Sequence, residues 1–185
     1  MIKKMTHVFN KKTTNKRGVI QMPEPIISYH KLVQENGRDI FKPINKLDFG
    51  NIQGSGDSNE LEFHIWNNFN GARDVPDLQL PKLTAVPSIP PPVGSADNTE
   101  VVDNNWLSVR EYDKTTWTKL GKASNGSDLE LSLSRTLTGL WNDGKYDDPD
   151  TGTNYIRMAA KLTVPMNADV TLPYIFDLKI TGKYV

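Results

Sequence analysis

The stretch Ile156-Arg157-Met158-Ala159-Ala160-Lys161-Leu162-Thr163-Val164 decides the fold class of this chain. Every even position from 156 to 164 is apolar, whereas three of the four positions between them are polar. Successive side chains of a β-strand point to opposite faces of a sheet, so this period of two is typical of a half-buried strand. The stretch therefore predicts a β-strand with one face in a core.

The same period recurs in three other segments. Apolar residues take every second position in 61–65, in 129–133 and in the segment that holds Tyr174, Phe176, Leu178 and Ile180. Weaker strands are predicted around 106–112 and 116–120, and the one predicted helix is short, near residues 27–34. Turn sequences such as Asn-Gly separate the runs. Short strands at this spacing predict an all-β chain that folds as an antiparallel β-sandwich.

Prolines mark a second kind of segment. Residues 76–92 hold half of the twelve prolines of the chain. Because proline has no N–H to give to a ladder of hydrogen bonds, we expect an edge strand or an extended crossover there.

Charge divides the chain into two parts. Residues 1–46 carry ten basic and three acidic residues, a net charge of +7, and residues 47–185 carry −7. The asymmetry predicts two regions: a basic N-terminal arm over 1–46 that includes the short helix, and a sandwich domain over 47–185. The arm could dock on the acidic surface of a neighbouring copy or on another anionic surface, the alternative being a merely solvated tail. Its candidate assembly residues are Lys3, Lys4, Lys11, Lys12, Lys16 and Arg17.

Composition excludes several classes of protein. The net charge of zero argues against a dedicated nucleic-acid binder, and no sequence-specific nucleic acid is expected as a partner. The chain has no cysteine, which removes disulfides, thiolate metal sites and cysteine nucleophiles. No apolar run approaches the ~20 residues of a membrane span, so no membrane partner is expected. The basic start is not followed by the apolar stretch of an export signal, so we expect synthesis in the cytoplasm.

Catalytic motifs are not found. The histidines at 7, 30 and 64 are far apart and form no H-E-x-x-H pattern. His64 falls on the outward face of its predicted strand, where a surface or interface role is expected. The chain also lacks a phosphate-binding loop and a G-x-S-x-G motif. We therefore expect no enzymatic activity and no cofactor.

Two groups of residues are weaker candidates for binding. Asp148 and Asp150 match part of a calcium loop, but Gly152 and Ala159 replace expected oxygen ligands, so a solvated acidic loop is favoured over a metal site. Trp66 and Trp106 are predicted to lie on the face opposite the aliphatic residues. There they could stack on a sugar. The favoured alternative is that the arm, the proline crossover or another subunit covers this face, since tryptophan is also common at interfaces.

Two resemblances extend this interpretation. Leu47-Asp48-Phe49-Gly50, with Gly54, Ser58 and residues 61–67, resembles the opening strands of immunoglobulin-like modules. More broadly, the chain resembles β-sandwich modules in structural proteins of tailed phages, and of phage tail-like particles, from Gram-positive bacteria. The segments that carry this second resemblance are 63–68, 106–110, 141–144 and 156–179.

The second resemblance implies assembly or host attachment, and no catalytic residues. We therefore expect a virion structural protein: an immunoglobulin-like sandwich anchored by its arm to a tail, baseplate or capsid, with other virion proteins and copies of itself as partners. The alternative is a carbohydrate-binding module that attaches to a host cell-wall glycan. A glycan hydrolase is a more distant alternative.

Overall fold

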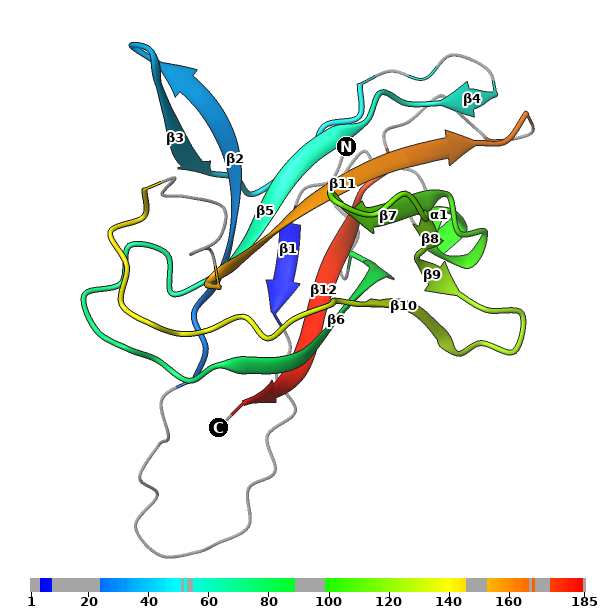
Figure 1. Cartoon of the computed structure of the whole chain (residues 1–185). Coiled ribbons are helices and arrows are strands. Elements are labelled where there is room, and N and C mark those ends of the chain that lie inside the picture. The colour runs from blue at the N-terminus through cyan, green and yellow to red at the C-terminus, as the bar shows by residue number, and fades with distance from the viewer. Residues whose placement is uncertain are drawn as a thin grey trace, which may run out of the picture.

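Figure 1 shows the chain as a computed structural model, in which the regular elements of the described residues are strands apart from one short helix. The structure describes residues 4–7, 24–50, 52, 55–88, 99–145, 153–166, 168 and 174–184.

The strands form two sheets. The order in the first is β1 (Lys4–His7), β12 (Phe176–Tyr184), β6 (Leu78–Pro87), β10 (Asp128–Ser132) and β9 (Gly121–Lys122). The order in the second is β3 (Arg38–Pro43), β2 (Ile27–Glu35), β5 (Leu61–Asn67), β11 (Tyr155–Val164), β7 (Leu107–Glu111) and β8 (Thr118–Lys119), and β4 (Gly56–Asp57) also pairs with β11. Apart from the parallel pair β1–β12, the described pairings between strands are antiparallel.

The core lies between the two sheets, and the predicted alternation accounts for it. Residues from both sheets share one apolar cluster, and its most deeply buried members include Phe63, Ile65, Met158, Phe176 and Leu178. These are the apolar positions of the alternating segments, so the prediction of an antiparallel all-β sandwich is confirmed. The helix α1 (Thr99–Asp103) adds Val101 and Val102 to the core. It is the one helix in the described residues and is far too short to cross a membrane.

The predicted helix near residues 27–34 is wrong, because this segment is strand β2. β2 and β3 form a hairpin whose turn holds Asn36 and Gly37, both with positive φ. An Asn-Gly pair adopts these angles readily and is a strong hairpin signal. β2 also pairs directly with β5. The hairpin is therefore part of the sandwich, and the predicted boundary at residues 46/47 does not separate an arm from the domain.

The expected proline crossover is also wrong over most of its described length. β6 is neither an edge nor a crossover, since it pairs with β12 on one side and β10 on the other. Its internal proline, Pro81, is accommodated by a bulge: Thr181 faces Lys82 and Lys183 faces Gln79, which leaves Leu80 and Pro81 opposite one residue of β12. A bulge releases proline from the ladder of hydrogen bonds. Residues 89–98 lie outside the described part of the chain.

The opening segment of the immunoglobulin-like resemblance differs from expectation. Residues 47–50 are not a strand, although Leu47 and Phe49 are buried in the core. These two apolar side chains account for the alternation that suggested a strand.

Candidate functional site

The outward face of the seven-stranded sheet carries two neighbouring groups of side chains. The strand registers place His30, His64 and Arg157 in one row across β2, β5 and β11. Tyr112 follows the end of β7 and extends this row, because its backbone N–H donates to the carbonyl of Arg157 at 2.9 Å. The row passes from an aromatic region to a charged one.

The first group is an aromatic cluster formed by Leu32, Phe41, Trp66, Phe69 and Tyr155 with the histidines His30 and His64. Trp66 stacks on Tyr155 with ring centroids 4.5 Å apart, and Phe41 reaches His64 at 4.8 Å. Phe41 comes from β3, so the hairpin folds its side chain over the sheet. The cluster thus forms a small second core on the face that sequence alternation marks as outward.

Both histidines of the cluster are buried, with 2% of His30 and none of His64 exposed. Burial lowers the pKa of each imidazole from 6.5 to about 4, because the charged form loses its solvation. For His64, Glu62 opposes this effect and Arg157 reinforces it. The two rings are therefore neutral at pH 7.

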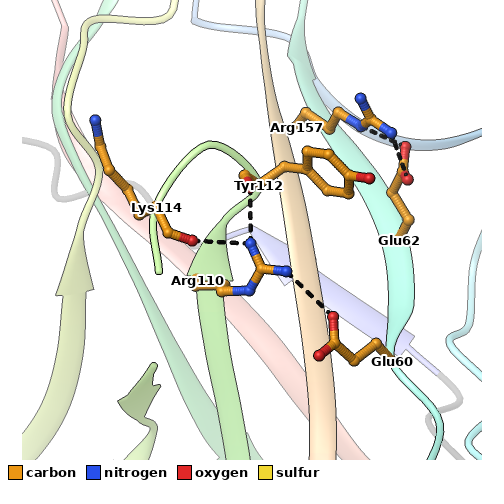
Figure 2. Close-up of polar contacts among 6 residues, drawn as sticks. All are labelled: Glu60, Glu62, Arg110, Tyr112, Lys114 and Arg157. Carbon is orange, nitrogen blue, oxygen red and sulfur yellow. Dashed lines mark hydrogen bonds and ion pairs between the residues drawn. The ribbon is translucent and has the colours of Figure 1, made fainter. Parts of the chain in front are cut away.

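The second group is a ladder of cations and aromatic rings, partly drawn in Figure 2. Arg157 lies 3.4 Å from the ring centre of Tyr112, and Arg110 lies 5.6 Å from Tyr112 and 4.9 Å from Trp117. Lys161 lies 5.1 Å from Trp117. We call these five residues the cation–aromatic ladder. Such contacts contribute about 0.5–1 kcal/mol each at exposed sites.

Each cation of the ladder also has a carboxylate partner. Glu62 accepts two hydrogen bonds from Arg157, at 2.6 and 2.7 Å, and Glu60 pairs with Arg110 at 3.2 Å (Figure 2). Asp57 pairs with Lys161 at 3.1 Å. Three positive charges therefore meet three negative ones. Since both rings are already approached by two cations, the ladder is a closed network and a poor platform for a sugar.

A third feature lies where the β5–β6 and β10–β11 connections meet. The amide group of Asn68 donates to the carbonyls of Arg73, at 2.8 Å, and Gly139, at 2.9 Å. Asn142 donates to the carbonyl of Asn68 at 2.6 Å. We call residues 68–77 and 137–145 the loop platform.

Buried asparagines at the strand ends bind backbone carbonyls of the platform. Asn67, at the end of β5, donates to the carbonyls of Pro76 and Leu137 at 2.9 and 3.1 Å. Asn154, beside β11, donates to the carbonyl of Leu140 at 2.7 Å. These bonds satisfy loop carbonyls that would otherwise need water, so they hold the two connections together.

The platform presents two apolar side chains to solvent: Leu140 is 52% and Trp141 63% exposed. The backbone N–H of Trp141 donates to Asp74 at 2.7 Å, and that of Gly139 donates to Asp77 at 2.8 Å. A Cβ at position 139 would collide with the carbonyl of Val75, so the approach of the two connections needs a glycine. Trp141 is thus an exposed ring on a firmly held backbone.

The structure shows where the candidate binding residues lie. Trp66 and Trp106, the candidates for a glycan or an interface, are only 3% and 4% exposed. Trp66 belongs to the aromatic cluster, and Trp106 packs in the main core. Phe41 of β3 covers Trp66, so of the two alternatives the covered face holds there. Trp106 belongs to the core between the sheets. The predicted surface or interface position of His64 is wrong, because its side chain is fully buried. Trp141 was missed, although the neighbouring asparagines and Gly139 mark a tightly turned loop.

The remaining candidates cannot be placed as sites. Asp148 and Asp150 lie outside the described residues, as do Lys3, Lys11, Lys12, Lys16 and Arg17. Lys4 lies in β1, where the backbone alone is described. Among the residues with described side chains, no three histidine, aspartate or glutamate residues are grouped as metal ligands.

Comparisons of the chain with protein-family models, curated proteins and solved structures find no match.

Proposed function

We propose that this chain is a non-enzymatic structural protein of a bacteriophage particle, an immunoglobulin-like sandwich built into a repeated assembly. The observation that carries the proposal is the loop platform, which presents Leu140 and Trp141 to solvent on a backbone fixed by buried amide groups. Tryptophan is enriched among the residues that dominate binding energy at interfaces, and a rigid surface loses little entropy when it binds. The kind of particle is inferred from the sequence resemblance.

The N-terminal arm is the second contact in this proposal. β1 pairs in parallel with β12 at the edge of the five-stranded sheet, and the register runs from Lys4 opposite Asp177 to His7 opposite Ile180. An edge strand presents unpaired backbone groups, which can pair with another chain. The six basic residues of segment 1–20 and the negative charge of residues 47–185 favour contacts between copies.

The platform contact is tested by particle incorporation. We expect Trp141→Ala and Leu140→Ala to lower the fraction of protein that sediments with the particle about tenfold, as for a hot spot. Met166→Ala is the matched control, because Met166 is also exposed but lies outside the platform. Normal incorporation of both platform variants would show that the assembly uses another surface.

The arm contact is tested separately by deletion of residues 1–20. We expect a folded monomer that no longer joins the particle at physiological salt, because the deletion removes β1 and six basic residues. If the truncated protein still assembles, the arm is not the anchor.

Trp141 also favours a second candidate function, which is binding of a cell-wall glycan. Its ring has no aromatic or cation partner among the contacts of the described residues, and the carboxylate of Asp74 lies beside its backbone. An exposed ring can stack on the apolar face of a sugar while neighbouring polar groups bind the hydroxyls. Purified host cell walls would then bind the wild type, bind Trp141→Phe more weakly and not retain Trp141→Ala. Release of soluble sugar would instead indicate the hydrolase.

A further inference from the structure

The hairpin β2–β3 is joined to the rest of the sheet over a short length only. The pairing of β2 with β5 begins at Ile27 and ends where His30 faces His64. Beyond this point, residues 31–42 pair with each other and make one isolated bridge, between Ile40 and Lys145. Figure 1 shows this part of the hairpin standing away from the sheet. We call residues 31–42 the projecting hairpin.

The side chain of Phe41 fastens the projecting hairpin to the sheet. Its ring lies 4.8 Å from His64, 5.0 Å from Trp66 and 5.6 Å from Tyr155. His30, at the root of the hairpin, lies 3.8 Å from Phe69 and 6.5 Å from Phe41. The two histidines are therefore part of the surface that holds the hairpin closed.

In the closed arrangement, a protonated imidazole of His30 or His64 would have few hydrogen-bond partners. Among the described residues, neither ring nitrogen of His64 has a hydrogen-bond partner, and His30 has one, at 2.9 Å from the hydroxyl of Ser28. The backbone of His30 favours a charged His64 slightly, but the two imidazoles repel each other when charged. A buried charge that lacks partners is costly.

Nearby charged groups do not compensate such a charge. On β5, Glu62 lies 3.9 Å from Nε2 of His64, but it already binds Arg157 of β11 through both oxygens. The other charged groups on the hairpin and at the bridge are exposed: Lys31 and Glu35 on β2, Arg38, Asp39 and Lys42 on β3, and Lys145. A proton on His64 would thus meet one shared carboxylate and two neighbouring cations, Arg157 and a charged His30.

We propose that the pair His30–His64 is an acid-operated hinge, which releases the projecting hairpin from the sheet when the imidazoles take up protons. In the closed form the pKa of each histidine is about 4, and exposure returns it toward 6.5. The closed form is therefore fully favoured above pH 6.5, and its advantage is lost as the pH falls from 6.5 to 4. Opening exposes Phe41, Trp66 and Tyr155, so acid converts a covered surface into an apolar one.

Amide hydrogen exchange of the full chain at pH 7 and pH 5 tests the proposal. After correction for intrinsic exchange, we expect the protection of amides in 31–42 to fall on the order of tenfold for each histidine that titrates, because a two-stranded hairpin released from the sheet is only marginally stable on its own. Amides of β12 should keep their protection, because β12 lies in the other sheet. Equal loss in β12 and the hairpin would mean that acid unfolds the whole domain, and the hinge would be wrong.

The variant His30→Phe/His64→Phe keeps aromatic rings but cannot take up the protons. We expect hairpin protection to become independent of pH between 7 and 5, whereas His7→Phe, the matched control in the other sheet, should behave as the wild type. A pH-dependent hairpin in the double variant would overturn the proposal.

A measurement on the wild type keeps the test valid if the double variant does not fold. Nuclear magnetic resonance of the imidazole C–H groups reports each histidine directly. We expect the signals of His30 and His64 to change only together with hairpin exchange. Titration of both near pH 6.5 in a closed hairpin would contradict the hinge.

Discussion

The two halves of the outward face of the seven-stranded sheet are covered in opposite ways. Around β2, β3 and the end of β5, aromatic rings and two neutral histidines exclude water. Around β11 and β7, cations lie over aromatic rings and bind carboxylates in a half-exposed network. The aromatic cluster derives its stability from burial. This contribution is large, but it requires that the imidazoles be neutral. The cation–aromatic ladder derives it from many weak contacts and needs no burial.

The comparison also shows that residues close together on one strand belong to different groups. On β5, Trp66 and His64 belong to the cluster, whereas Glu62 binds Arg157 of the ladder. On β11, Tyr155 belongs to the cluster and Arg157 to the ladder. A step of two residues along a strand thus separates a buried surface from a solvated one.

A substitution in the main core gives the reference against which the stability changes in both halves can be compared. We expect Phe176→Ala to lower the free energy of unfolding by about 3–5 kcal/mol, because its fully buried ring leaves a cavity. Lys179→Ala, three residues away on the other face of β12, should change it by no more than about 0.5 kcal/mol. Urea denaturation of the two variants measures the difference. Equal midpoints would contradict the register of β12.

Phe41→Ala should show that the aromatic cluster acts as a core. We expect a loss of about 2–4 kcal/mol, since Phe41 is buried among the rings of His30, His64, Trp66, Phe69 and Tyr155. Tyr112→Ala, in the ladder, should lose only about 1 kcal/mol, as expected for a half-exposed ring with cation contacts. Thermal unfolding of both variants compares the two halves directly. If Tyr112→Ala proves the more damaging change, the contrast between burial and surface contacts is mistaken.

The aromatic cluster should be the half that is sensitive to acid. Because burial holds the pKa of His64 at about 4, the free energy of unfolding should fall by about 1–2 kcal/mol from this residue between pH 7 and pH 5. His64→Phe should remove that part of the slope, which denaturation at several pH values would measure. An unchanged slope would show that His64 is not buried as described.

The ladder should show a small but measurable coupling. A double-mutant cycle of Glu62→Gln and Arg157→Gln should give about 0.5–1 kcal/mol, because both side chains are about one third exposed and screened by water. The exposed pair Lys114–Asp113 is the control, with a coupling close to zero. The coupling between Glu62 and Arg157 should weaken in high salt, and insensitivity to salt would argue against an ion pair.

The fold was more predictable from the sequence than the surface. Alternation predicted the core faces of β5, β11 and β12, because a period of two reports which side of a strand is apolar. It could not report what covers the other side, so the sequence predicts a surface or interface position for His64 and leaves an exposed or a covered face as alternatives for Trp66. Phe41, which covers them, comes from a hairpin that was interpreted as helix and arm.

Some local sequence signals pointed to the observed structure, but the interpretation of the surrounding segments did not follow them. Asn36-Gly37 indicates a hairpin turn, yet the segment before it was interpreted as a short helix. Pro81 argued against a central strand, and only the bulge opposite Gly182 reconciles the two. The exposure of Trp141 depends on hydrogen bonds between two distant connections, which no local pattern reports.

β11 and β12 each lie between two neighbouring strands of their sheets, and this has a consequence for synthesis. Tyr155 of β11 pairs with Trp66, and Leu178 of β12 pairs with Ala85, so the partners are about 90 residues apart in the chain. A ribosome adds ~5–20 residues per second, so β11 and β12 are synthesised roughly 5–18 s after their partners β5 and β6. During that interval their apolar faces have no closed core to enter. The nascent chain is therefore more prone to aggregate until β11 and β12 emerge, and slower translation would lengthen that exposure.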